Sequence, residues 1–360
     1  MPLFWIIVLF IVGLILIIKG GDWFVDASSW IAEKSGIPKF IIGATIVSFA
    51  TTLPELLVSV LATVKGSTDM AIGNAVGSVT ANVGLIMGIS MVCLPSFIKR
   101  KDLAFKGLLM TFACVLLYIM CVSGTLKIFN GIVLLLVFIA FTAENVLSAK
   151  KTLLLNKNEN YKKEDYGYGK VTSNTEKLSN ITNVGFVGNQ NSAAKADSKK
   201  NDFLFVNITK FVLGASGIVG GAQLLVTYGG QLALKLGVPE SIIGFTLVAV
   251  GTSLPELVTT ITAIIKKEAS LSIGNIVGAN IIDLTVILPI CALISAKNGG
   301  LIISPQTIAQ NLYLDFPVCL GLILIAVVPT LIFGRYRRYQ GIIMLICYAA
   351  YVVVLCLGLF

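Results

Sequence analysis

The sequence predicts an all-α polytopic membrane protein whose ten transmembrane helices form two inverted five-helix repeats. Composition is the first reason, since 56% of the 360 residues are apolar, 12% are charged and the mean hydropathy is +0.91. A water-soluble fold of this length could not bury so much apolar surface. The second reason is a series of long apolar runs, and the third is a polar motif that occurs once in each half of the chain.

Ten apolar runs are long enough to cross roughly 30 Å of hydrocarbon. They lie at residues 3–32, 38–64, 69–95, 104–122, 127–148, 203–234, 240–265, 270–296, 315–333 and 340–359. The first run has no basic leader and no clear small-residue cleavage site, so we expect it to be retained as the first helix.

A polar segment divides these runs into two groups of five. We expect a first five-helix repeat at residues 1–149, a flexible linker at 150–202 and a second five-helix repeat at 203–360. The linker is rich in Lys, Asn, Ser, Gly and Glu and shows no sustained periodicity, so it should not bury enough apolar area to become ordered. We interpret it as a tether between the repeats, with a regulatory or docking element as the alternative.

Basic residues concentrate in alternate loops, which predicts the orientation of the chain. The side of the Lys-rich linker also carries Lys99, Arg100, Lys101, Lys106, Lys266, Lys267, Arg335, Arg337 and Arg338. The loops of the other side carry one lysine each, namely Lys65, Lys127, Lys235 and Lys297. Because positive charge in short loops marks the cytoplasmic side, we expect the linker in the cytoplasm, both termini outside and the protein in the cell membrane.

The composition also argues against nucleic-acid binding, a disulfide framework and a zinc site. The net charge of +9 does not indicate nucleic acid, because the basic residues lie in short runs between apolar stretches. The seven cysteines include no CxxC pair and the chain has no histidine, so we expect neither a disulfide framework nor a zinc site.

An internal repeat carries the strongest functional signal. Residues 20–83 recur without a gap at an offset of 201 (256 − 55), with the most similar residues in the motifs at 43–83 and 244–284. Thr51-Thr52-Leu53-Pro54-Glu55 recurs as Thr252-Ser253-Leu254-Pro255-Glu256, and Gly73-Asn74-Ala75-Val76-Gly77 recurs as Gly274-Asn275-Ile276-Val277-Gly278. Since five helices is an odd number, the second copy enters the membrane from the opposite side, and inverted copies that share a midplane site are a recurring architecture of secondary transporters.

Each copy places a proline directly before a glutamate inside an apolar run. A proline in a helix interior removes one amide donor and disturbs the preceding turn. Pro54 should therefore free the carbonyl of Ala50, and Pro255 should free that of Gly251. Carbonyl oxygens freed in lipid need a partner, so each copy supplies a carboxylate and loosened carbonyls at one depth.

Further oxygen atoms share a face with these glutamates or lie on the next helix. Helical spacing places beside the two carboxylates the residues Ser48, Thr51, Thr52, Thr252 and Ser253. The next helices carry two equivalent stripes, which are Asn74, Ser78 and Asn82 in the first copy and Asn275, Ala279 and Asp283 in the second.

Glu55, Glu256 and Asp283 have no basic partner in their apolar runs. A single charge in a membrane costs several kcal/mol, so these groups should hold cations or protons at all times. Ligation by oxygen alone suits Ca²⁺ or Na⁺ and argues against transition metals. The structural alternative is a set of interhelical hydrogen bonds that only holds the bundle together. Asp22, Asp26 and Glu144 lie toward helix ends, where we expect solvation.

At these motifs the sequence resembles the cation/calcium exchanger superfamily, whose sodium/calcium exchangers carry two inverted alpha-repeats. The resemblance covers essentially the whole membrane portion and implies ten helices, of which the first and sixth slide across a fixed core. It implies Ca²⁺ held by Glu55 and Glu256 with the carbonyls of Thr51 and Thr252. The sodium sites that it implies draw on the same glutamates, on Ser78, on the backbone of Ser48 and Ala249, and on the hydroxyls of the two threonines, Thr51 and Thr252. Asn82 and Asp283 complete the centre, and Thr52 and Ser253 are the further candidate ligands beside the glutamates.

The sequence departs from the family pattern at Ala279, where the repeat and the family would supply a serine. One peripheral sodium site thereby loses a hydroxyl ligand. We expect a Ca²⁺/Na⁺ antiporter that acts by alternating access as a monomer in the lipid bilayer, with no cofactor and no enzymatic activity. A Ca²⁺/H⁺ or K⁺-dependent exchanger is the alternative, and a cation channel and a non-transporting scaffold are the other classes considered.

Overall fold

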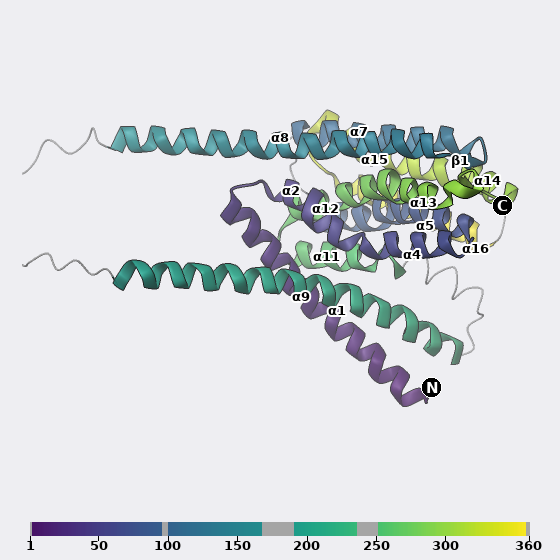
Figure 1. The fold of residues 1–360 in the computed structure, drawn as a ribbon, viewed down its shortest axis with the longest axis horizontal. Coiled ribbons are helices and arrows are strands. Elements are labelled where there is room, and N and C mark those ends of the chain that lie inside the picture. Colours follow the sequence, from purple (N-terminus) through teal and green to yellow (C-terminus); the bar gives the residue numbers. More distant parts are fainter. Residues whose placement is uncertain (1, 96–99, 168–190, 236–250, 358–360) are drawn as a thin grey trace, which may run out of the picture.

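The computed structural model describes residues 2–95, 100–167, 191–235 and 251–357, which are almost entirely helical (Figure 1). The first half contains α1 (Leu3–Ser35), α2 (Lys39–Ile42), η1 (Gly43–Val47), α3 (Ser48–Thr51), α4 (Leu53–Val64), α5 (Thr68–Ala81), η2 (Asn82–Met87), α6 (Gly88–Cys93), α7 (Arg100–Cys121) and α8 (Ile128–Gly167). The second half contains α9 (Asn191–Lys235), α11 (Leu254–Ile265), α12 (Ala269–Ile282), η3 (Asp283–Ile287), α13 (Leu288–Ile294), η4 (Ser295–Asn298), α14 (Pro305–Gln310), η5 (Asn311–Asp315), α15 (Phe316–Phe333) and α16 (Arg338–Cys356).

Two short strands link the halves. β1 (Thr125–Leu126) pairs antiparallel with β2 (Leu301–Ile302), with Thr125 opposite Ile302. They connect the loop between α7 and α8 to the loop after η4, so a loop of each half is fixed to the other at the same end of the bundle.

The apolar runs form membrane-length helices, as predicted for a polytopic membrane protein. Within the described ranges, eight helices are long and apolar enough to cross a membrane, and a ninth span arises if Lys39–Thr51 and Leu53–Val64 count as one helix bent by 42°. The predicted run 240–265 is described only from residue 251, where α11 begins at Leu254. The total of ten spans therefore stays a prediction.

The predicted limits of the linker and of one span differ from the structure. α8 continues to Gly167 and α9 begins at Asn191, so helix extends into both ends of the segment 150–202. The helix-forming Lys, Leu, Glu and Ala residues in those ends explain the extension. The run predicted to begin at residue 315 instead begins at Pro305, where the hydroxyl of Ser304 accepts a hydrogen bond from the Thr307 amide.

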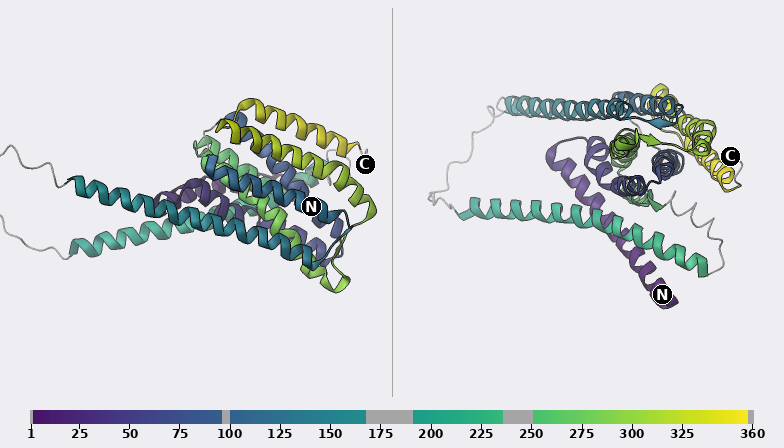
Figure 2. Two further views of the ribbon diagram at one scale, coloured as in Figure 1. Left: turned by 90° about the horizontal axis from the view of Figure 1, so that it is seen from above. Right: turned by 45° about the vertical axis from the view of Figure 1, so that its right-hand side comes forward.

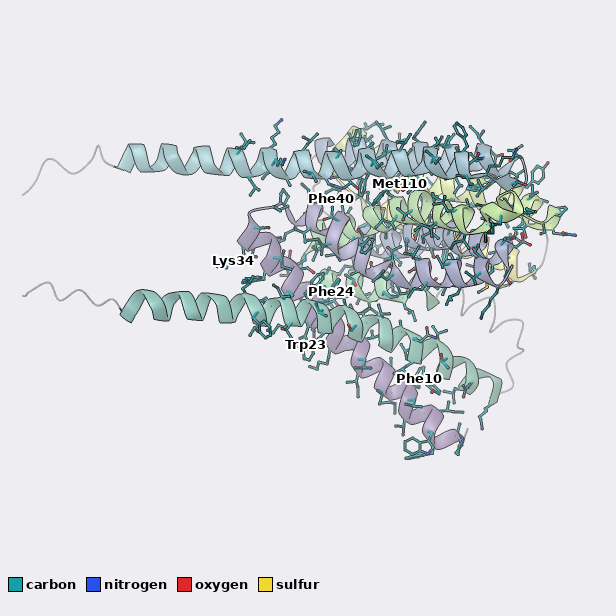
Figure 3. All side chains as sticks on the ribbon, viewed as in Figure 1. Phe10, Trp23, Phe24, Lys34, Phe40 and Met110 are labelled. Atoms are coloured by element: carbon teal, nitrogen blue, oxygen red, sulfur yellow. The ribbon has the colours of Figure 1, made fainter. Side chains whose placement is uncertain are left out.

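α1 and α9 lie side by side and cross one flank of the bundle (Figures 1 and 2). Glycines allow their backbones to meet, because a Cβ atom on Gly20 would lie 2.8 Å from the carbonyl oxygen of Gly214. Phe24 of α1, labelled in Figure 3, packs against Phe211 of α9 with 4.7 Å between ring centroids and 36° between the ring planes. The two helices therefore form one closely packed pair.

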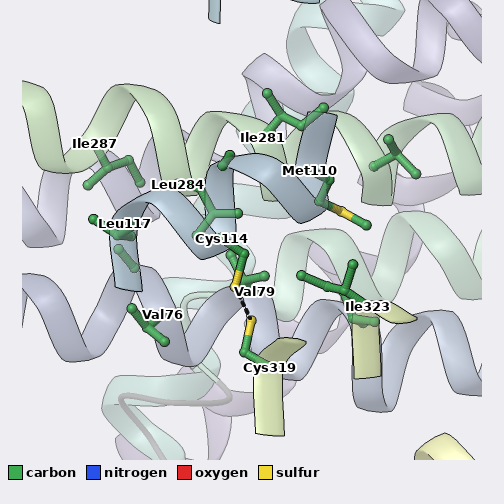
Figure 4. Close-up of a cluster of buried hydrophobic side chains, with 14 of the residues drawn as sticks. Val76, Val79, Met110, Cys114, Leu117, Ile281, Leu284, Ile287, Cys319 and Ile323 are labelled. Carbon is green, nitrogen blue, oxygen red and sulfur yellow. Dashed lines mark hydrogen bonds between the residues drawn. The ribbon is translucent and has the colours of Figure 1, made fainter. Parts of the chain in front are cut away.

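The core lies between α5, α7, α12 and α15 (Figure 4). Val76 and Val79 of α5 meet Ile281 of α12 and Cys114 of α7 there, and the Cys114 Sγ lies 3.8 Å from the Cys319 Sγ. α12 also packs against α2, η1 and α3, so the second repeat contacts the bent helix of the first.

The acids near the helix ends also have basic partners, and the Asp22 and Asp26 side chains are 45% and 60% exposed, in keeping with the expected solvation. Lys266 lies 2.8 Å from Asp26 and 3.4 Å from Asp22, and this links α11 to α1. Glu144 pairs at 3.2 Å with the buried Lys106. A long lysine stem can be buried along apolar surface while its ammonium group reaches a carboxylate, which explains the pair.

The tightest approach between the repeats yields a stability prediction. A Cβ atom on Gly274 would lie 2.2 Å from the Phe40 carbonyl oxygen, so Gly274→Ala must push α12 away from α2. We expect a loss of about 1–3 kcal/mol in stability, seen as a lower midpoint of thermal unfolding in detergent. Gly321→Ala in α15 is the matched control, because no described atom lies within 4 Å of its added Cβ. Equal midpoints for the two variants would contradict the assigned packing.

Candidate cation site

Each copy of the repeated motif begins a helix with its Pro-Glu pair. α3 ends at Thr51 and α4 begins at Leu53, and the two helices meet at the 42° bend. Thr52 has φ −83° and ψ −1°, and Ser253, its equivalent before α11, has φ −85° and ψ 5°. The two breaks thus have the same backbone conformation, which fits the proline effect expected from the sequence. Glu55 and Glu256 lie in the first turns of α4 and α11, where the helix dipole favours negative charge.

Hydroxyl groups cross between the two copies and bring the glutamates together. The Thr52 hydroxyl donates to Glu256 Oε1 at 3.4 Å, and the Ser253 hydroxyl donates to Glu55 Oε1 at 3.5 Å. Thr52 and Ser253 are equivalent residues, as are Glu55 and Glu256, so the two bonds exchange partners between the repeats. This reciprocal pairing is the contact expected when two inverted copies meet at one centre.

A second crossed pair lies beside the first. The Thr51 hydroxyl is 3.2 Å from Asn275 Oδ1, and the equivalent Thr252 hydroxyl is 3.3 Å from Asn74 Oδ1. Asn74 also donates from Nδ2 to the Glu55 carbonyl at 3.1 Å and to the Ser59 hydroxyl at 2.9 Å. Asn74 therefore joins α5, the start of α4 and the opposite repeat.

The acidic and amide groups of the centre are buried without full hydrogen bonding. Glu55, Glu256, Asp283 and Asn82 each have 0% of their surface exposed. In the part of the chain that the structure describes, buried oxygens without a hydrogen-bond partner include Glu55 Oε2, Glu256 Oε2, both carboxylate oxygens of Asp283, Ser78 Oγ and Asn82 Oδ1. Glu55 interacts electrostatically with both Glu256 and Asp283. Buried acceptors of this kind require donors or cations, since an unpaired buried charge is costly.

The helices that carry Asn82 and Asp283 widen at these residues. Asn82 is the first residue of the π-helical turn η2, and Asp283, its equivalent, is the first residue of η3. π-helical turns inside α-helices occur frequently at functional sites. Both copies thus place the same local irregularity at the same position of the repeat.

The structure positions most of the predicted site residues. One pair of crossed bonds joins Thr52 to Glu256 and Ser253 to Glu55, and the other joins Thr51 and Thr252 to the asparagines of the opposite repeat. The Ser48 carbonyl accepts from the hydroxyls of Thr51 at 3.3 Å and Thr52 at 2.7 Å. Ser78, Asn82 and Asp283 are buried on α5, η2 and η3, and α5 contacts both η2 and η3. Ala249 lies outside the described residues.

Carboxylates alone do not make a metal site here. Among the described residues, no three Asp, Glu, His or Cys side chains are grouped so that they could hold a metal ion. A cation at this centre would therefore also need hydroxyl, amide and carbonyl oxygens, a ligand set that suits Ca²⁺ or Na⁺. The sequence pattern placed Asn74 and Asn275 on the polar stripes but gave no sign of their bonds to Thr252 and Thr51.

The unequal bonding of the two asparagines yields a second prediction. Asn74→Ala removes three recorded hydrogen bonds and Asn275→Ala removes one, so Asn74→Ala should lower stability more, by about 1–3 kcal/mol relative to Asn275→Ala. The measurement is thermal unfolding of both variants in detergent without added Ca²⁺. An equal or larger loss in Asn275→Ala would show that Asn74 does not join the two repeats.

Comparisons with known proteins agree with this arrangement. The family described as sodium/calcium exchanger protein matches residues 5–146 and 206–357. The sodium/calcium exchanger MaX1 of Methanosarcina acetivorans is 31% identical over 346 residues, 96% of this chain and 97% of that protein, and the uncharacterized membrane protein MJ0091 of Methanocaldococcus jannaschii is 29% identical over 94% of each chain. The solved structure of the sodium-calcium exchanger NCX_Mj soaked with Na⁺ and Sr²⁺ has a TM-score of 0.72 at 26% identity, covering 98% of this chain and 99% of that one. The chain therefore belongs to the sodium/calcium exchanger protein family of membrane antiporters.

Proposed function

We propose that this protein moves Ca²⁺ across the membrane in exchange for Na⁺ by alternating access. The observation that supports this most directly is the reciprocal pairing of the two glutamates with hydroxyls of the opposite repeat. Each glutamate keeps a second carboxylate oxygen that is buried without a partner in the described chain. Such a centre favours occupation by cations, because removal of one ion without replacement would leave carboxylates ionised in a low-dielectric interior.

The ligand roles in this proposal follow the family resemblance. Glu55 and Glu256 hold Ca²⁺ with the carbonyls of Thr51 and Thr252. Sodium ions use the same glutamates with the hydroxyls of Ser78, Thr51 and Thr252 and the backbone of Ser48 and Ala249. Asn82 and Asp283 complete the centre. The burial of the described members of this set supports the assignment, since a bound ion replaces the water that each oxygen lacks.

The proposed molecule has ten membrane spans in two inverted repeats and works as a monomer in the cell membrane. Its linker lies in the cytoplasm and both termini lie outside, as the basic loops predict. The cycle carries Ca²⁺ out of the cell while Na⁺ enters. A Ca²⁺/H⁺ or K⁺-dependent exchanger is the second candidate, which the alanine at position 279 favours.

The glutamates provide the first transport test. Glu55→Gln and Glu256→Gln keep side-chain size but remove a negative charge from the centre, so each should reduce Na⁺-gradient-driven Ca²⁺ uptake to the level of empty liposomes. The measurement is Ca²⁺ flux into proteoliposomes with Na⁺ inside. Glu33→Gln is the matched control, because Glu33 has a side chain 65% exposed at the end of α1. Wild-type flux in both site variants would leave only a packing role for the glutamates.

The missing serine provides a test of the counter-ion. Ala279 is fully buried on α12, next to Gly278, whose added Cβ would lie 2.5 Å from the Ser48 hydroxyl. Ala279→Ser should restore a hydroxyl ligand and lower severalfold the Na⁺ concentration that gives half-maximal Ca²⁺ exchange. Ala279→Cys is the size-matched control without a hydroxyl. Uptake that ignores Na⁺ in both wild type and Ala279→Ser but follows a proton gradient would favour the Ca²⁺/H⁺ exchanger instead.

A further inference from the structure

A second acidic centre lies inside a membrane span and away from the candidate cation site. The span Pro305–Phe333 is interrupted by the π-helical turn η5, which begins at Asn311 and ends at Asp315. Two of the other π-helical turns in the described chain begin at Asn82 and Asp283, so this irregularity elsewhere accompanies polar residues of the cation site. Asp315 lies beyond the repeated motifs and has no role in the proposed exchange site.

Among the residues that the structure describes, the donors to the Asp315 carboxylate are neutral. The Tyr351 hydroxyl of α16 donates to Oδ1 at 2.9 Å, and the Gln310 amide donates to Oδ2 at 3.2 Å. Asp315 is 4% exposed, and it takes part in none of the ion pairs found among the described residues. An ionised carboxylate at such a position lacks the positive charge that burial in a membrane requires.

A buried amide without a partner lies one turn before this carboxylate. Asn311 is 1% exposed, and in the described chain neither its Oδ1 nor its Nδ2 has a hydrogen-bond partner. Residues that begin and end one π-helical turn lie on nearly the same side of the helix. Asn311 and Asp315 therefore face the same protein interior, where the amide oxygen is available to accept one further hydrogen.

From this geometry we propose that Asp315, Asn311 and Tyr351 form a proton-binding site within the membrane. A proton from water adds to the Asp315 carboxylate, cancels its charge and gives a carboxyl O–H that donates to Asn311 Oδ1, while Tyr351 continues to donate to the other oxygen. One carboxylate balances one positive charge. The cluster offers too few oxygens for Ca²⁺, which takes about six to eight ligands, whereas a proton needs one donor oxygen and one acceptor.

Within the described ranges, the groups that interact with Asp315 carry no positive charge. Tyr351 faces it from α16 and has Tyr348 beside it, and Cys319 faces it from α15, with Cys114 of α7 in contact with Cys319. These titratable groups are all neutral in their protonated forms. Protonation of Asp315 therefore changes the charge of this interior by one full unit.

α16, which carries Tyr351, packs against η2, the turn that begins at Asn82 of the candidate cation site. Tyr348 and Tyr351 share a buried cluster with Leu314 and with Ala81, the residue before Asn82. A Cβ atom on Gly84 in η2 would lie 2.8 Å from the Tyr348 Cβ, so α16 packs tightly on the turn that begins at Asn82. A change in the Asp315–Tyr351 bond would act on this contact, and this link to transport rests on the proposed exchange.

Infrared difference spectroscopy of the purified full chain in lipid tests proton binding without measuring transport. The spectrum between acidic and alkaline pH should contain the C=O stretch of a protonated, non-aqueous carboxylic acid that disappears at alkaline pH and is missing in Asp315→Asn. Asn has the size of Asp and retains a hydrogen-bond acceptor for Tyr351. Asp69→Asn is the control, because Asp69 lies in the first turn of α5, where it accepts from the Ser304 amide, and its replacement should leave the band unchanged.

Two companion variants separate the site from the carboxylates of the cation centre. Tyr351→Phe removes a donor that favours the ionised form, so the band should persist to higher pH. Glu55→Gln should leave the band in place. Coinciding spectra of wild type and Asp315→Asn, or a band that does not change with pH, would overturn the proposal. Loss of the band on addition of Na⁺ or K⁺ at constant pH would also overturn it, since the site would then take an alkali ion.

Discussion

The arrangement of this protein depends on one constraint, which is that carboxylates placed in a membrane interior need an opposite charge or a proton. The crossed bonds from Thr52 to Glu256 and from Ser253 to Glu55 position two such carboxylates but supply no positive charge. Neutral donors fix where the oxygens lie without satisfying them fully. The carboxylate oxygens that remain without a hydrogen-bond partner are those that a bound cation would contact in the proposed exchange. The contacts that position the glutamates therefore leave a centre that needs a bound cation or proton.

Two residue types, proline and glycine, allow the helices to form this centre. Prolines at equivalent positions interrupt the helices just before the glutamates, and this turns the carboxylates and neighbouring hydroxyls toward the opposite repeat. Glycines then allow the helices that carry the remaining oxygens to come close, as where Gly274 meets the Phe40 carbonyl. Neither feature is effective alone, because broken helices held apart by side chains could not exchange hydrogen bonds.

Much of the fold could be predicted from the sequence, because lipid imposes simple rules on apolar runs. The helix Leu3–Ser35 and the bend before Pro54 follow directly from hydropathy and from the missing proline amide. The start of the helix at Pro305 did not, since polar residues in its first two turns lowered the hydropathy, and its signal was the Ser304 cap. That error placed Asp315 at a helix end, although it lies inside the span.

The site was predictable as a set of residues but not as a set of contacts. The repeat identified Glu55 and Glu256, yet a spacing rule places hydroxyls only on their own helix face. Which hydroxyl reaches which carboxylate depends on how two separate helices dock, and that is decided by packing across the whole core. The same limit applies to Asn74, whose three bonds extend to α4 and to the other repeat.

The glycine contacts between α1 and α9 have a mechanical consequence. At Gly20 and Gly214 the backbones of the two helices approach each other directly, with a carbonyl oxygen next to a glycine. No side chain separates the two backbones at this point. If one helix slid past the other, its backbone carbonyl oxygens would clash with the Cα atoms of the neighbouring helix. We therefore expect α1 and α9 to move as one rigid body, so that a displacement of α1 in the first repeat also displaces α9 in the second.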